Sequence, residues 1–127
     1  MNARVLLIDD SRAMRILLAS HVRALGFEVA EAGDGSAGLA MLKNAGDVRF
    51  VLVDWNMPVL NGLEFIRAVR ACTEYRHLRL IVITSETEAS QVMAALSAGA
   101  DEYLMKPFTR EALASKLELL GLLQGVP

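Results

Sequence analysis

Five residues of this chain could together handle a phosphoryl group and a metal ion if the fold brings them to one place. Asp9, Asp10 and Asp54 offer carboxylates, Thr84 offers a hydroxyl group and Lys106 offers an ammonium group. Two carboxylates about 4 Å apart repel each other by roughly 4 kcal/mol at an effective dielectric constant of 20, so such a cluster raises its pKa values or recruits a cation. Carboxylate oxygens suit Mg²⁺, which also prefers phosphate oxygens.

The lysine and the threonine would supply the other half of this chemistry. An ammonium group on a long stem can pair with a phosphoryl oxygen, and a hydroxyl group can donate a hydrogen bond to another. Phosphoryl transfer needs mainly positioning and charge neutralisation. An aspartate can be the acceptor, as in other aspartyl-phosphate intermediates.

The elements that must position these residues follow from a regular alternation along the chain. Short apolar runs predict five strands, and the amphipathic stretches between them predict five helices. We expect strands at 4–8, 27–32, 50–53, 80–83 and 101–105, and helices at 11–25, 34–44, 61–71, 87–98 and 109–122. Asp34 and Thr109 are predicted helix caps, and Gly26 and Gly99 are predicted helix ends.

A strand followed by a helix at every step predicts an α/β fold, a doubly wound parallel sheet with helices on both faces. Ligands of such sheets lie beyond the carboxyl ends of the strands. The five candidate residues all fall at predicted strand ends. Taken singly, each is more simply a cap, a turn residue or a surface charge. Their joint occurrence at strand ends favours a shared site.

Length and composition narrow the classes of function. The 127 residues fit one domain over 1–127, with no output domain. A net charge of -2 argues against a nucleic-acid partner. No run approaches the roughly 20 apolar residues of a membrane span, and the single cysteine, Cys72, forms no internal disulfide, so we expect a cytoplasmic protein without membrane contact. We expect Cys72 to be a small buried residue, and His21 and His77 to lie on a helix face and in a loop.

Four segments resemble the response-regulator receiver domains, in particular those of the chemotaxis type. They are Val5-Leu-Leu-Ile-Asp-Asp-Ser-Arg-Ala-Met-Arg15, Asp54-Trp-Asn-Met-Pro58, Ile83-Thr-Ser-Glu86 and Lys106-Pro-Phe108. The similarity spans nearly the whole chain, from residue 5 to about 120. It implies a flavodoxin-like (βα)5 domain with a parallel sheet of order 2-1-3-4-5.

The resemblance also implies a role for each site residue. Asp54 would accept the phosphoryl group and Lys106, followed by a cis peptide bond to Pro107, would pair with it. Mg²⁺ or Mn²⁺ would be bound by Asp10 directly, by Asp9 mainly through water, by Asp54 and by the backbone carbonyl of Asn56. Thr84 and Tyr103 would move together as the switch. Asn56 and Glu86 would tune dephosphorylation, and their identities imply a short-lived phosphorylated state.

The function implied is that of a stand-alone response regulator in a two-component phosphorelay. A sensor histidine kinase would donate the phosphoryl group, and the face formed by the fourth helix, fifth strand and fifth helix would bind a target protein or phosphatase, for example in chemotaxis. The chain would be a monomer, with phosphorylation-dependent dimerisation left open. It would not be an enzyme beyond catalysing its own phosphorylation and dephosphorylation.

Several alternatives stay open at this point. A phosphorelay shuttle or phosphate sink would use the same residues. A phosphatase with an aspartate nucleophile would usually carry Asp-x-Asp after the first strand and a cap domain, and a flavin carrier would need a Ser/Thr/Gly-rich loop there. A degenerate receiver binds its partners without being phosphorylated, and the intact set of site residues in this chain argues against it. Within the resemblance, Asn61 stands where Asp is more common, and Glu86 and Glu88 make the start of the fourth helix acidic.

Overall fold

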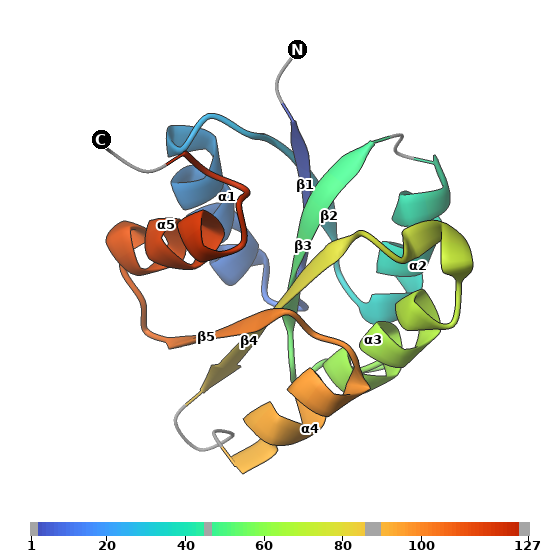
Figure 1. The fold of residues 1–127 in the computed structure, drawn as a ribbon. Helices are drawn as coiled ribbons and strands as arrows, with labels where there is room; N and C mark the ends of the chain where they lie inside the picture. The colour runs from blue at the N-terminus through green and yellow to red at the C-terminus, as the bar shows by residue number, and fades with distance from the viewer. Residues whose placement is uncertain (1–2, 45–46, 86–89, 125–127) are drawn as a thin grey trace.

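The computed structural model describes residues 3–44, 47–85 and 90–124, in which strands and helices alternate (Figure 1). The strands are β1 (Arg4–Ile8), β2 (Glu28–Ala32), β3 (Val48–Asp54), β4 (Arg79–Ser85) and β5 (Glu102–Lys106). The helices are α1 (Arg12–Ala24), α2 (Gly35–Asn44), α3 (Gly62–Arg70), α4 (Val92–Ala98) and α5 (Arg110–Leu119), and the 3-10 turn η1 (Thr73–Tyr75) follows α3.

The strands form one parallel sheet of order β2-β1-β3-β4-β5, which confirms the expected fold class and strand order. Helices α1 and α5 cover one face, and α2, α3 and α4 cover the other (Figure 1). Each face has its own apolar core, one built around Phe50, Leu113 and Leu117 and the other around Phe65, Ile66 and Val69. Because the central strands are buried on both faces, their sequences are almost continuously apolar.

Polar side chains cap the starts of α1, α2, α3 and α5. The Ser11 hydroxyl accepts a hydrogen bond from the Met14 amide (3.2 Å), and Asp34 accepts one from the Ala37 amide (2.8 Å). Asn61 and Glu64 form a reciprocal capping box at α3, and the Thr109 hydroxyl caps α5. These contacts satisfy amides that have no partner inside the helix. The predicted caps at Asp34 and Thr109 are therefore confirmed, and Asn61 serves as a cap.

The structure differs from the expected elements at a few boundaries. Helix α4 is described from Val92, directly after two residues, 90 and 91, in 3-10 conformation, and its expected start at 87 lies outside the described part of the chain and stays a prediction. The fifth helix ends at Leu119 and not at 122, because Gly121 adopts a left-handed φ of 72° that ends it. The turn η1 was not predicted. None of the helices in the described residues is long and apolar enough to cross a membrane.

The expectation for Cys72 was wrong, because its side chain is exposed. Cys72 precedes η1 in the connection from α3 to β4, outside the sheet and its two cores, and its side chain makes no capping hydrogen bond. A single cysteine in a loop belongs to no hydrophobic periodicity that would indicate which way it faces. The prediction of burial therefore rested only on the general tendency of cysteine to be buried.

Candidate metal and phosphoryl site

The five residues first singled out meet at the carboxyl edge of the sheet. Asp9 and Asp10 follow β1, Asp54 ends β3, Thr84 is the next-to-last residue of β4 and Lys106 ends β5. In the parallel register Ile8 pairs with Val53, Asp54 with Ile83 and Thr84 with Met105. Strands aligned in this way place their last residues next to one another, so the topology assembles the site.

The three aspartates form a tight acidic cluster. One ligand atom from each of Asp9, Asp10 and Asp54 lies within 4.8 Å of the others. Among the described residues, this is the one group of three or more side chains close enough to bind a metal together. Neither His21 nor His77 belongs to it. Asp9 is 1% exposed and Asp54 5% exposed, whereas Asp10 is open to solvent. Two buried carboxylates therefore lie beneath an accessible one.

Lys106 brings a positive charge into this cluster. Its ammonium nitrogen lies 3.1 Å from Asp54 Oδ1 and 3.7 Å from Asp9 Oδ2. The lysine side chain is 27% exposed, so it reaches from the surface to the two buried carboxylates. One ammonium group facing three carboxylates leaves the cluster with an excess of negative charge.

Asp9 shows the effect of burying a carboxylate in this cluster. Its Oδ1 accepts a hydrogen bond from the Ser11 amide (2.9 Å), but its Oδ2 is buried without a hydrogen bond from the described residues. Burial raises the pKa of Asp9, and so does the charge of Asp10, while the Ser11 amide, Lys106 and Arg15 act in the opposite direction without cancelling the rise. A hard cation bound by oxygen ligands would relieve both features, so these residues fit Mg²⁺.

Thr84 presents a second buried polar atom. Its residue is 0% exposed, and its Oγ1 has no hydrogen-bond partner among the described residues. Buried polar groups are normally paired, because an unpaired one costs about 1–3 kcal/mol. The unpaired Thr84 hydroxyl lies near Asp54, the last residue of β3. It can therefore donate a hydrogen bond to an oxygen atom of a group bound at Asp54.

The remaining expected site residues lie around this centre. Asn56 follows Asp54 in the β3–α3 connection and is exposed. Tyr103 is half-buried on the edge strand β5, apart from the acidic cluster. Glu86 lies outside the described residues, so its expected role stays a prediction. The Lys106–Pro107 peptide bond is cis, as the resemblance implies.

Two residues that help to shape the site were not found from the sequence. Gly62 lies so close to β3 that a Cβ atom there would be 2.8 Å from the Asp54 carbonyl oxygen and 2.9 Å from Trp55 Cα. Arg15 donates to the Asp9 carbonyl oxygen at 2.5 Å and pairs with Glu31 at 3.2 Å. The Asn-Gly pair before α3 did signal a turn, but the close approach of Gly62 depends on tertiary packing.

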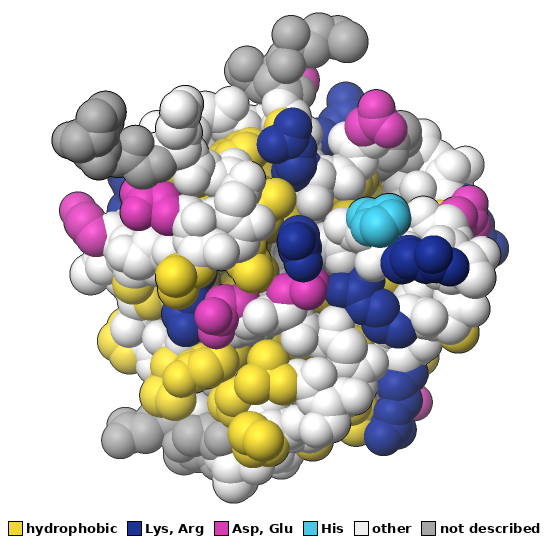
Figure 2. All heavy atoms as spheres, viewed as in Figure 1, with side chains coloured by type: hydrophobic (Ala, Val, Ile, Leu, Met, Phe, Trp, Pro, Cys, Tyr) yellow, Lys and Arg dark blue, Asp and Glu magenta, His cyan; other side chains and the backbone are white. Residues whose placement is uncertain are grey.

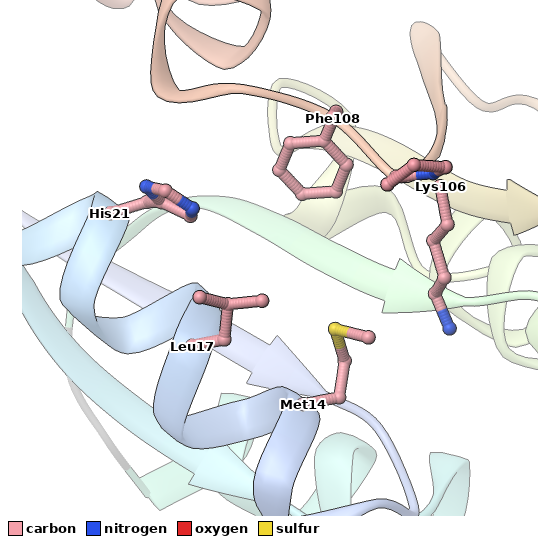
Figure 3. A pocket seen from close by; sticks show the side chains of 6 residues that line it. Met14, Leu17, His21, Lys106 and Phe108 are labelled. Atoms are coloured by element: carbon pink, nitrogen blue, oxygen red, sulfur yellow. The ribbon is translucent and has the colours of Figure 1, made fainter.

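A groove opens beside Lys106 on the α1 side of the site. It encloses about 280 Å³ and is lined by Met14, Leu17, His21, Lys106, Pro107 and Phe108. Figure 3 shows the α1 side chains facing Phe108 and Lys106 across this groove. The His21 Nδ1 atom accepts a hydrogen bond from Arg110 Nε (3.3 Å). The groove is mostly apolar, and its charged end adjoins the acidic cluster.

Comparisons with known proteins agree with this geometry. Residues 5–118 match the model of the response regulator receiver domain. Chemotaxis protein CheY of Pseudomonas aeruginosa is 40% identical over 116 residues, which cover 91% of this chain and 93% of the relative. Chemotaxis protein CheY-3 of Vibrio cholerae is 41% identical over 118 residues, covering 92% of this chain and 90% of the relative.

A solved structure shows the same likeness in three dimensions. Chemotaxis protein CheY4 of Vibrio cholerae superposes with a TM-score of 0.86 at 33% identity, covering 94% of this chain and 99% of that chain. Sequence, fold and strand-end residues thus converge on one family. The chain belongs to the family of response regulator receiver domains.

Proposed function

We propose that this receiver domain accepts a phosphoryl group on Asp54 and changes its binding surface in response. The observation that carries the proposal is the pairing of Lys106 with buried Asp54 (3.1 Å) beside the Asp9–Asp10 pair. A nucleophilic carboxylate, a mobile cation and oxygen ligands for a metal are together what phosphoryl transfer to an aspartate needs.

The transfer step uses the groups that meet at the strand ends. A carboxylate oxygen of Asp54 attacks the phosphorus of a phosphohistidine, an O–P bond forms, and the N–P bond breaks with its electron pair returning to the imidazole. The Lys106 ammonium moves its pairing from the carboxylate to a phosphoryl oxygen. The buried Thr84 hydroxyl donates to another phosphoryl oxygen and gains the partner it lacks among the described residues.

Mg²⁺, or Mn²⁺, is the cofactor that these residues would hold. Asp10 and Asp54 would be direct ligands, Asp9 would act mainly through water, and the Asn56 carbonyl would complete the protein ligands. When bound, the ion neutralises charge on the phosphoryl oxygens. Hydrolysis of the acyl phosphate by water returns Asp54 to its free form, and we expect Asn56 and Glu86 to set its rate.

The phosphoryl donor is expected to be a histidine kinase. A donor histidine must approach Asp54 closely enough for in-line transfer, and Lys106 both contacts Asp54 and forms one end of the apolar groove (Figure 3). A helix carrying the phosphohistidine can bury apolar side chains against Met14, Leu17 and Phe108 while its imidazole faces Asp54. The groove therefore supports docking of the donor on the α1 side.

The output is expected from the α4–β5–α5 face, which carries Tyr103. Figure 2 shows hydrophobic side chains gathered between β5 and α4, and Met93 of α4 is 70% exposed. An exposed apolar surface of this kind suits a protein partner. Because the relatives compared above are chemotaxis proteins, a target in chemotaxis is the first expectation. A phosphorelay shuttle or phosphate sink is the alternative.

The first test follows the fluorescence of Trp55, the single tryptophan, which is 8% exposed and adjacent to Asp54. Mg²⁺ is added first and beryllofluoride or acetyl phosphate second, with the Asp54→Asn variant as control. We expect a change with the metal and a second change that the control lacks. Mass spectrometry on the acetyl phosphate sample should find one phosphoryl group on Asp54.

The outcomes separate the candidate functions. Decay of the acetyl phosphate signal within minutes of removing the donor indicates a short-lived switch, and a much longer lifetime favours the shuttle or sink. Persistent labelling of Asp54→Asn by acetyl phosphate would remove Asp54 as the acceptor. Flat fluorescence together with no aspartyl phosphate would leave a degenerate receiver that binds its partners unphosphorylated.

A further inference from the structure

Three side chains form a cluster where α5 meets the open edge of the sheet. The Lys116 ammonium lies 2.8 Å from Glu102 Oε1 and 4.3 Å from the centroid of the Tyr103 ring. The same Glu102 oxygen accepts a hydrogen bond from the Tyr103 amide at 3.0 Å. One carboxylate thus holds both the backbone of Tyr103 and the cation that lies over its ring.

The cluster connects the two faces of the edge strand. Leu104 packs into the core beneath α1 and α5, so by alternation Tyr103 starts from the opposite face of β5. Thr84 pairs in register with Met105, two residues after Tyr103, so Thr84 and Tyr103 share that face. Lys116 belongs to α5, which covers the Leu104 face of the sheet. Its side chain extends past the edge of β5 to the Tyr103 ring.

The charges in the cluster support each other. The Lys116 and Glu102 side chains are 25% and 22% exposed, so solvent screens this pair less than a fully exposed one. Burial raises the pKa of Glu102, but the hydrogen bonds from Lys116 and the Tyr103 amide and the charge of Lys116 lower it overall. A cation over an aromatic face is attracted to the ring quadrupole. Without the carboxylate, Lys116 would be free to extend into water.

We propose that Glu102 is a positioning residue that, by holding Lys116 over Tyr103, keeps the ring where it is seen here and opposes its move toward Thr84. This inference rests on the proposed function in one respect, namely that phosphorylation of Asp54 moves Tyr103. In that case the Glu102–Lys116 clamp sets how much phosphorylated or analogue-bound Asp54 is needed to switch the surface.

The test observes Tyr103 directly. The chain has two tyrosines, so protein labelled with 3-fluorotyrosine gives two ¹⁹F resonances, which the Tyr75→Phe variant assigns. The variants are Glu102→Gln, which keeps an oxygen acceptor but removes the charge, and Lys116→Met, which keeps an apolar stem. Glu118→Gln makes the same chemical change at an exposed position of α5 and is the matched control. Spectra are recorded with Mg²⁺ at increasing beryllofluoride.

In both clamp variants we expect the donor-free Tyr103 resonance to shift toward its beryllofluoride position in the wild type. The beryllofluoride midpoint should fall about two- to tenfold, the range of one half-buried ion pair and one cation–π contact. The control should match the wild type. An unchanged midpoint, with a resonance that stays in place or moves elsewhere, would overturn the clamp. A wild-type resonance blind to beryllofluoride, with no label on Asp54, would instead refute the proposed function and with it the role of the clamp.

Discussion

Val59 is the one non-glycine residue with a positive φ in the described part of the chain, at 69°. The Leu60 amide donates to the Pro58 carbonyl oxygen at 2.8 Å, so Val59 is the central residue of a tight γ-turn. A β-branched side chain is strained in this region of backbone space. Val59 is also 79% exposed, so packing of its side chain does little to offset the strain.

Replacing this valine should stabilise the protein. Asn tolerates a positive φ, so Val59→Asn should raise the free energy of unfolding by about 1 kcal/mol, the lower end of the cost of one strained residue. Equilibrium urea unfolding measures the change. Val59→Thr is the matched control, since it keeps the branch at Cβ and should gain little. Equal stabilities of the Asn and Thr variants would show that the turn is not strained.

Single residues differ in how well the sequence predicts them. The positions of Asp9, Asp54, Thr84 and Lys106 could be predicted because they end strands, and a parallel register brings strand ends together. The strain at Val59 could not, since it depends on a turn set by the surrounding packing. The unpaired Asp9 Oδ2 likewise depends on which neighbours reach it, and sequence spacing does not contain that information.

Asp101 joins several elements at the amino end of β5. Its Oδ2 accepts hydrogen bonds from Arg70 of α3 (2.9 Å) and from the Leu80 amide of β4 (2.8 Å). Arg70 also donates to the carbonyl oxygens of Gly99 (2.9 Å) and Tyr75 (3.0 Å). This network fixes α3, the end of α4 and the start of β4 to one carboxylate, so it supports the sheet opposite the acidic cluster.

Asp101→Asn should destabilise the protein, because the neutral amide loses the charge that strengthens the hydrogen bonds from Arg70 and from the Leu80 amide. We expect the free energy of unfolding to fall by about 1–3 kcal/mol, the usual range for a lost charged hydrogen bond. Hydrogen exchange should quicken at the Leu80 amide first. Arg79→Gln is the control, because Arg79 is 47% exposed and its pair with Asp101 should contribute at most about 0.5 kcal/mol. Equal losses in both variants would contradict the central role of Asp101.

The edge strand and α5 should be held together in a pH-dependent way. The pKa of Glu102 is lowered from its ordinary value of 4.5, so its stabilising effect is complete above pH 4.5 and is lost as the pH falls through the folded-state pKa. The wild type should therefore be more stable than Glu102→Gln at pH 7, and the two should converge in acid. Urea unfolding at a series of pH values measures this difference. A constant difference across the series would assign the effect to shape and not to charge.

Elements were predicted best where capping and apolar pattern agree. Asp34 and Thr109 mark helix starts by side-chain hydrogen bonds that depend on local sequence alone. No side-chain hydrogen bond caps α4 at Gln91, so this helix lacks such a local marker, and the amphipathic pattern alone does not locate its start. The strand order came from the family resemblance, since local pattern does not decide which strands are neighbours.

For the whole molecule, we expect the acidic cluster to make stability depend on a cation. Mg²⁺ should stabilise the wild type by about 2.7 kcal/mol at a concentration 100 times the dissociation constant. Asp9→Asn removes one buried charge, so without metal it should unfold at a higher temperature than the wild type, and it should gain less from Mg²⁺. Thermal unfolding with EDTA and with Mg²⁺ measures both effects.

Asp47→Asn is the control for this experiment, because Asp47 is exposed at the amino end of β3, away from the cluster. It should leave both the metal-free stability and the Mg²⁺ gain unchanged. If Asp9→Asn were less stable than the wild type in EDTA, the repulsion among the buried carboxylates would be smaller than the hydrogen bonds that Asp9 makes, and the cluster would not be poised for a cation.

The exposed thiol of Cys72 gives the molecule a natural attachment point. It is the single cysteine of the chain and lies between α3 and β4, where β4 begins, whereas Asp54 and Lys106 lie where their strands end. A maleimide dye or a surface tether at Cys72 would be separated from the acidic cluster by the length of the sheet. The unmodified sequence can therefore be immobilised in one orientation with its acidic cluster facing outward, ready for measurements on single molecules.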